Sequence, residues 1–355
     1  MDKEFLLDLL TSDSPSGYEQ NCVKTFDEFM SKFSKNILHD AVGNSAYVIG
    51  EGGGKKTIML SAHVDEIAMQ VQNIDENGFV HFIKDGYTDL KSLIGTSVRI
   101  LTENGTVRGV IGKKPIHLEE DEDDTKAIEA KDLKIDIGVS SKDEAAELVS
   151  VGDPIVSDTI PYMIGPNRIV SKGLDDKSGL YVVGEVMRLL STTTLRNVQV
   201  VGVACTQEET SASGAVAAAR ALNPFVSIDY DVTFATDDGY VDANEWGDVK
   251  LGGGGCIAHG ADCNVKLTRL ARKVCKENKI PFQEFSLESG ATNTVEIKKS
   301  ASDCLTMLMS VPNRNMHTAV EVCDLRDLDS LVQMTVNLII AIDDNQLNTN
   351  VNATA

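Results

Sequence analysis

Residues 201–215, VGVACTQEETSASGA, decide the fold that the sequence predicts. This stretch continues a valine-rich run, turns polar at the adjacent carboxylates Glu208 and Glu209, and leads into the alanine-rich run AVAAARAL. A short apolar run, a polar turn and an alanine-rich run together predict a buried strand, a loop and a helix. Because ligands bind at the carboxyl ends of the strands in an open α/β sheet, these two carboxylates stand where chemistry is expected.

Taken alone, a pair of glutamates is more often a solvated acidic turn than a catalytic pair. Successive residues of an extended segment point in opposite directions, so one glutamate of the pair could bind a metal while its neighbour faces a water. The rest of the chain has to decide between these two interpretations.

Composition narrows the class of protein. A chain of 355 residues suffices for one large or two medium domains. Its net charge of −21 argues against partners such as nucleic acid or an anionic membrane surface, which require clustered Lys and Arg. No apolar run approaches the roughly 18 residues of a membrane span, and no signal peptide is visible. The seven cysteines are scattered without a CxxC pair, which is typical of reduced thiols in a cytoplasmic protein.

The remaining segments predict two domains. Strands and helices alternate over residues 1–69 and 166–345, which indicates a mostly parallel sheet sandwiched by helices in an α/β fold. Between them, residues 70–165 hold short, alternating, β-branched runs separated by Gly and Asn turns, which favour an inserted small β-barrel. We expect the acidic run at 119–124 to be a solvated loop and the polar tail 346–355 to be disordered.

Several polar clusters fall at predicted strand ends or in loops. Any one of them has an ordinary explanation: a lone histidine is more often structural, and two aspartates in a Gly-rich loop usually form a turn or a helix cap. Together they form the ligand set of hydrolytic zinc, cobalt or manganese sites, which use His, Asp and Glu without Cys. The clusters are His63 with Asp65, Asp175 with Asp176, Glu208 with Glu209, Asp229 with Asp231, and His317.

The motifs AHVDE, GLDDKSG, TQEETSASGA, YDVT and VPNRNMH occur in this order, with the β insert after the first. They resemble the dinuclear metallo-aminopeptidases, the family of the glutamyl aminopeptidases and the TET peptidases, and the resemblance covers nearly the whole chain. It implies a peptidase α/β sandwich with an inserted dimerisation β-domain. It also implies two divalent metal ions per chain, zinc or cobalt, and removal of N-terminal residues from short peptides. Self-association up to a hollow dodecamer is a further implication.

The resemblance also implies roles for individual residues. His63 and Asp231 would bind one metal, Glu209 and His317 the other, and Asp175 would bridge the two. Glu208 would be the general base on the water between the metals, and Asp65 would steady His63. Asp229, Asp237 and Asp238 lie close in sequence to Asp231, but only Asp231, in YDVT, matches the family's aspartate.

Two departures from the family pattern bear on substrate binding. Asn293 stands where the family usually has an aspartate, and Asn315 and Met316 replace an aromatic residue. We expect Asn293 and Arg314 to lie at the substrate, and acidic, basic and neutral preferences all stay open. Two rival functions remain: another amide hydrolase on this scaffold, such as an acylase or deblocking enzyme, and a catalytically silent binding protein.

Overall fold

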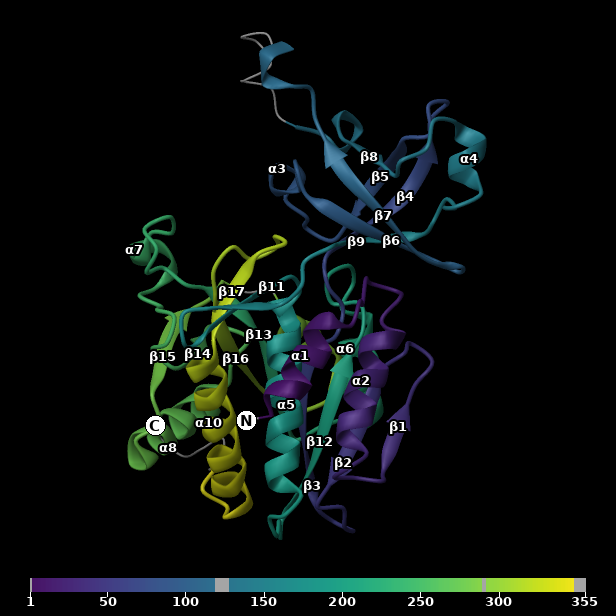
Figure 1. The fold of residues 1–355 in the computed structure, drawn as a ribbon. Helices are drawn as coiled ribbons and strands as arrows, with labels where there is room; N and C mark the ends of the chain where they lie inside the picture. Colours follow the sequence, from purple (N-terminus) through teal and green to yellow (C-terminus); the bar gives the residue numbers. More distant parts are fainter. Residues whose placement is uncertain (1, 119–127, 289–291, 348–355) are drawn as a thin grey trace.

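The computed structural model describes residues 2–118, 128–288 and 292–347. Figure 1 shows a layered α/β domain with a smaller β-barrel above one end of its sheet. The acidic run at 119–124 and residues 348–355 of the predicted tail lie outside the described residues. Among the described residues, no helix is long and apolar enough to cross a membrane.

A large mixed sheet forms the centre of the α/β domain. The four inner strands of this sheet pair in parallel, whereas the strand on each side of these four joins them antiparallel. The predicted α/β fold with a helix-covered, largely parallel sheet is thereby confirmed. In spatial order the described strands are β1 (Ile37–His39), β2 (Ser45–Ile49), β12 (Val198–Cys205), β3 (Lys56–His63), β13 (Val226–Phe234), β16 (Leu305–Asn313), β14 (Gly255–His259) and β15 (Phe282–Ser286).

Helices cover both faces of this sheet (Figure 1). One face packs against the main apolar core, and its helices are α1 (Lys3–Thr11), α2 (Gln20–Met30), α5 (Leu174–Leu190), α8 (Val265–Asn278) and α10 (Leu325–Asp343). The opposite face is covered by α6 (Ser213–Leu222) and α9 (Asn293–Ser300), whose Ala218 and Ile297 pack on the sheet. Helix α6 is the alanine-rich run of the opening stretch, and its small side chains let it lie close to the strands.

The insert is a closed barrel, as predicted. Its core consists mainly of buried branched side chains, among them Val80, Ile100 and Ile135. The barrel strands, in the order in which they pair, are β4 (Ala68–Ile74), β5 (Val80–Asp85), β8 (Lys134–Asp136), β7 (Gly105–Gly112), β6 (Ser97–Thr102) and β9 (Pro154–Ser157). Between these strands lie the helices α3 (Leu90–Leu93) and α4 (Lys142–Ala146) and the 3₁₀ turns η1 (Ile116–Leu118) and η3 (Ala130–Asp132).

Ion pairs and a small sheet join the barrel to the α/β domain. Arg99 of the barrel pairs with Asp13 of the N-terminal loop at 2.7 Å and with Asp158 after β9 at 2.9 Å. The chain then returns through a three-stranded sheet: β10 (Tyr162–Ile164), β11 (Arg168–Ser171) and β17 (Glu321–Asp324). The barrel is thus fixed beside the carboxyl ends of the central strands.

Candidate active site

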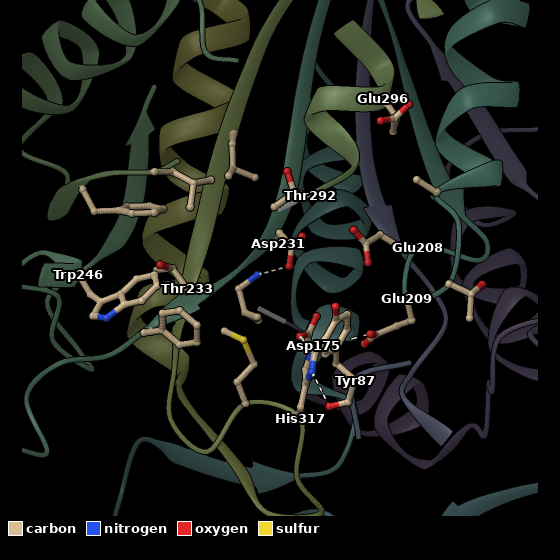
Figure 2. Close-up of a pocket in the computed structure, with 18 of the residues that line it drawn as sticks. Tyr87, Asp175, Glu208, Glu209, Asp231, Thr233, Trp246, Thr292, Glu296 and His317 are labelled. Carbon is tan, nitrogen blue, oxygen red and sulfur yellow. Dashed lines mark hydrogen bonds and ion pairs between the residues drawn. The ribbon is translucent and has the colours of Figure 1, made fainter. Parts of the chain in front are cut away.

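The central strands bring the predicted residues to one edge of the sheet. His63 ends β3, Asp231 lies near the end of β13, and Glu208 and Glu209 follow β12. Because β12, β3 and β13 are parallel neighbours, their carboxyl ends meet. Figure 2 shows Asp175, Glu208, Glu209, Asp231 and His317 around one cavity.

Asp175, at the start of α5, lies between two histidines. Its Oδ1 is 3.0 Å from Nε2 of His63, and its Oδ2 is 3.2 Å from Nε2 of His317. Each histidine uses its other ring nitrogen on a backbone carbonyl. Nδ1 of His63 donates to Asp65 at 3.0 Å, and Nδ1 of His317 donates to Tyr87 at 3.2 Å. Metal-binding histidines are typically oriented in this way, with one nitrogen on a fixed acceptor and the other free for the ion.

The donor atoms fit a divalent cation. Ligand atoms of His63, Asp175 and Glu209 all lie within 4.8 Å of one another. Oε1 of Glu209 is buried without a hydrogen-bond partner, and Oε2 lies 3.8 Å from Nε2 of His317. A buried carboxylate oxygen without a partner costs free energy unless a cation or proton satisfies it.

The electrostatics of the buried carboxylates also favour a divalent cation at this site. Burial raises the pKa of Asp231 and that of Glu209 well above their usual values, and the charge of Asp175 raises both further. The neighbouring histidines offset these effects only in part. This crowding of buried carboxylates favours added positive charge, and hard oxygen ligands with imidazole suit a divalent ion such as zinc or cobalt.

The four aspartates that compete for the fifth ligand position have different surroundings. Asp231 lines the cavity beside Glu208. Asp229 lies deeper in β13, where Ser61 and Thr294 donate hydrogen bonds to it at 2.6 and 3.0 Å. Asp237 pairs with Arg314 at 2.7 Å, and neither Asp237 nor Asp238 is part of the cavity wall.

Asp65 positions the two glutamates through their backbone. Its carboxylate accepts hydrogen bonds from the backbone N–H groups of Glu208 at 2.9 Å and Glu209 at 3.1 Å, and from the hydroxyl of Ser16. The predicted partner of the Asp65 carboxylate, the ring of His63, is farther away, with 3.4 Å between Nδ1 and Oδ1. The Asp65 backbone carbonyl is nearer to that ring than its carboxylate is.

Burial raises the pKa of Glu208 to about 7, and the charges of Asp175 and Asp65 contribute to the shift. A carboxylate with a pKa near neutrality can both accept and return a proton, which is what a general base and acid requires. Its side chain faces the cavity beside Asp175 (Figure 2).

Comparison with known proteins gives the family. A sequence profile described as M42 glutamyl aminopeptidase matches residues 43–334. The chain belongs to this family. It is similar to the lysyl aminopeptidase of Pyrococcus furiosus, with 29% identity over 96% of this chain and 97% of that protein.

Solved structures give the same picture. A TET aminopeptidase from a marine sediment archaeon of the Thaumarchaeota superimposes with a TM-score of 0.92 at 27% identity, covering 97% of each chain. An aminopeptidase from the archaeon Desulfurococcus kamchatkensis gives a TM-score of 0.88 at 30% identity, over 99% of this chain and 98% of that one. The predicted family and the assignment as a peptide hydrolase are confirmed.

Three further residues of this M42 family member, which the sequence does not single out, belong to the candidate site. The carboxylate of Glu321, in β17, accepts hydrogen bonds from the backbone N–H groups of Asp175 and His317, both at 2.9 Å. Asp65 binds the backbone of Glu208 and Glu209 in the same way. A carboxylate within the apolar run TAVEVC was the available signal for Glu321. Tyr87 of the barrel and Trp246 of α7 (Ala243–Trp246) line the cavity, and their sequence surroundings carry no comparable signal.

The two predicted substrate residues lie outside the cavity wall. Asn293 is buried at the start of α9, and its neighbour Thr292 lines the cavity instead. Arg314 is held by Asp237. Substrate contacts by Asn293 and Arg314 stay predictions.

Proposed function

We propose that this M42 enzyme is a two-metal aminopeptidase that removes N-terminal residues from short peptides. The observation that carries the proposal is the placement of Asp175 between His63 and His317, with each ring oriented by a backbone carbonyl. In this proposal His63 and Asp231 hold one ion, and Glu209 and His317 the other. Asp175, whose two oxygens face the two histidines, would be a ligand of both.

When bound, two divalent ions supply Lewis-acid polarisation of the scissile carbonyl and an anchor for the free α-amine. Glu208 takes a proton from the attacking water and returns it to the leaving amine. Asp65 holds Glu208 in place through its backbone, so the whole carboxylate stays free for this exchange.

Assembly and location are part of the same proposal. The TET1 peptidase of Pyrococcus horikoshii, 30% identical over 95% of this chain with a TM-score of 0.84, assembles into a tetrahedron or a large octahedral shell, and a dodecamer of it is known. We place this chain in a homo-oligomer, up to a dodecamer, that forms through the barrel. Its cysteines are all free, which fits the cytoplasm.

The test combines elemental analysis with hydrolysis of a panel of aminoacyl-p-nitroanilides, with and without added zinc or cobalt. Two ions per chain and release of p-nitroaniline from part of the panel would support the proposal. If the enzyme binds metal but hydrolyses neither these amides nor their N-acylated analogues, the result would contradict the proposal. Hydrolysis of only the N-acylated analogues would favour an acylase or deblocking enzyme, and neither metal nor hydrolysis after reconstitution would favour a silent scaffold.

A further inference from the structure

The cavity has two chemically different halves. Its volume is about 480 Å³, enough for a large side chain together with the backbone of a peptide N-terminus. Figure 2 shows Glu208 and Glu209 on one side, above Asp175 and His317, and Trp246 with Thr233 on the opposite side. One half therefore carries the reacting groups, and the other half leaves space for a substrate side chain.

The half around Trp246 is an apolar wall. Trp246 packs edge-on against Phe234, with ring centroids 5.0 Å apart and planes at 82°. The apolar residues Phe285, Leu308 and Met316 also line the cavity. Trp246, the single tryptophan of the chain, is 43% exposed, so much of this residue stays uncovered on the side of the cavity opposite the two glutamates.

The wall is held in place by backbone hydrogen bonds. The Thr236 N–H donates to the carbonyl of Val249 at 2.8 Å, and the Thr236 hydroxyl donates to the carbonyl of Gly247 at 2.8 Å. Gly247, with φ +94°, follows Trp246 directly and lies against Phe285, where a Cβ would come within 3.2 Å of that side chain. The loop that carries Trp246 is thus closed on itself and packed onto β15.

Charge around the cavity is one-sided. Among the described residues that line it, none is Lys or Arg, and five are Asp or Glu. Four of these five belong to the reacting half, where His63 and His317 lie and where bound divalent ions would offset their negative charge. The fifth, Glu296, is paired with Lys299 at 2.6 Å. A substrate carboxylate seated against Trp246 would find no cation there and would lose its hydration.

We propose that the enzyme prefers an aromatic or long aliphatic N-terminal residue, whose side chain packs on Trp246 and Phe234. This inference rests on the proposed function, since it names the side chain of that same substrate. An acidic N-terminal residue is disfavoured, because its carboxylate would lose hydration against the apolar wall and meet no cation there. A basic one gains little, because Glu296 lies on the side of Glu208, away from Trp246, and is already paired with Lys299.

The first part of the test compares kcat/KM for Phe, Leu, Ala, Lys and Glu p-nitroanilides on the metal-loaded enzyme. We expect the Phe and Leu substrates to exceed the Lys and Glu substrates by about 10-fold or more. Trp246→Ala should lower kcat/KM for Phe and Leu by about 10- to 100-fold while changing the Ala substrate by less than about 2-fold. Trp246→Phe should restore most of the loss, because it retains an aromatic wall.

Tyr240→Ala is the matched control, because Tyr240 lies on the same loop, is 91% exposed and does not line the cavity. It should leave the whole panel unchanged. Equal loss on all substrates in Trp246→Ala would show a structural role only and would overturn the proposal. A kcat/KM for the Glu or Lys substrate equal to that for the Leu substrate would also overturn it.

A binding readout separates this inference from the proposed function. Because Trp246 is the single tryptophan, its fluorescence reports on this wall without any turnover. Titration with free phenylalanine or leucine should shift the emission in a saturable manner, and glutamate or lysine should not. If no substrate is hydrolysed but the shift occurs, the proposed function fails and the apolar wall stands. Hydrolysis with no shift for any apolar amino acid would count against the wall.

Discussion

Gly86 of the barrel lies directly against Glu209 of the α/β domain. A methyl group on its Cα would come within 3.3 Å of Glu209 Oε2 and 3.1 Å of Ile67 Cγ2. Tyr87, the next residue, accepts the hydrogen bond from His317. A two-residue segment of the insert therefore lies against two of the proposed metal ligands, and the insert contributes to the proposed active site.

Gly86→Ala should damage the site beyond its effect on the backbone. Its φ of +79° costs an alanine about 1–2 kcal/mol, and the added methyl pushes on Glu209. We expect kcat/KM to fall by about 10- to 100-fold, with weaker metal retention. Gly95→Ala is the control, since Gly95 has the same φ of +79° with open space around it. Equal activity in the two variants would show that the contact with Glu209 is unimportant.

The metal content of two variants should distinguish the roles of Glu208 and Glu209. Glu208→Gln keeps the size of the side chain but cannot take a proton, so turnover should fall by about 100- to 10,000-fold while bound metal is retained. Glu209→Ala should instead lose metal. Elemental analysis after gel filtration, together with kcat, distinguishes them. Normal turnover in Glu208→Gln would remove Glu208 from its role.

A second matched pair tests the fifth ligand. Asp231→Asn should weaken metal binding by more than about 10-fold, because Asp231 faces the cavity beside Glu208. Asp237→Asn should leave metal binding unchanged and only release Arg314 from its ion pair. Competition with a chromophoric chelator measures both affinities. The reverse result would transfer the ligand role to Asp237.

The acid stability of the protein should depend on Glu66. Burial alone would raise the pKa of Glu66, but Lys172 at 2.6 Å and Lys177 at 3.1 Å outweigh it and lower the pKa to about 2 from an ordinary 4.5. Since the folded-state pKa is the lower one, the stabilisation is complete above pH 4.5 and is lost as the pH falls through 2. Linkage puts it at about 3 kcal/mol.

Urea unfolding of the wild type and of Glu66→Gln, followed by circular dichroism, tests this dependence. The variant should be less stable at pH 7, because buried Lys177 loses its ion pair with Glu66 and buried Lys172 keeps only Asp13, at 3.1 Å. The difference between the two proteins should shrink by more than half at pH 3. A difference that stays constant with pH would rule out Glu66 as the titrating group.

The sequence allowed us to predict which residues meet at one edge of the sheet when those residues follow strands. His63, Glu208, Glu209 and Asp231 come at or near the ends of apolar runs, and parallel pairing brings such ends together whatever the details of packing. Tyr87 and Trp246 could not be found in this way. Their places depend on how the barrel and the loop after β13 fold back over the sheet, which no local pattern encodes.

The same limit applied to hydrogen-bonding partners. Asp65 was selected as a partner of the His63 ring, but its carboxylate mainly holds the backbone of Glu208 and Glu209. Glu321 does the same for Asp175 and His317. A side chain that binds a distant backbone N–H leaves no mark on the sequence of the segment it binds.

The hydrogen bond from His317 ends on a main-chain oxygen, and that has an evolutionary consequence. Any amino acid at position 87 presents the same carbonyl, so the orientation of the His317 ring does not depend on the tyrosine side chain. That side chain also lines the substrate cavity. Mutation at position 87 can therefore change which substrates fit the cavity while the orientation of His317 is kept. Substrate preference can then diverge among descendants of this protein without a change in the proposed catalytic residues.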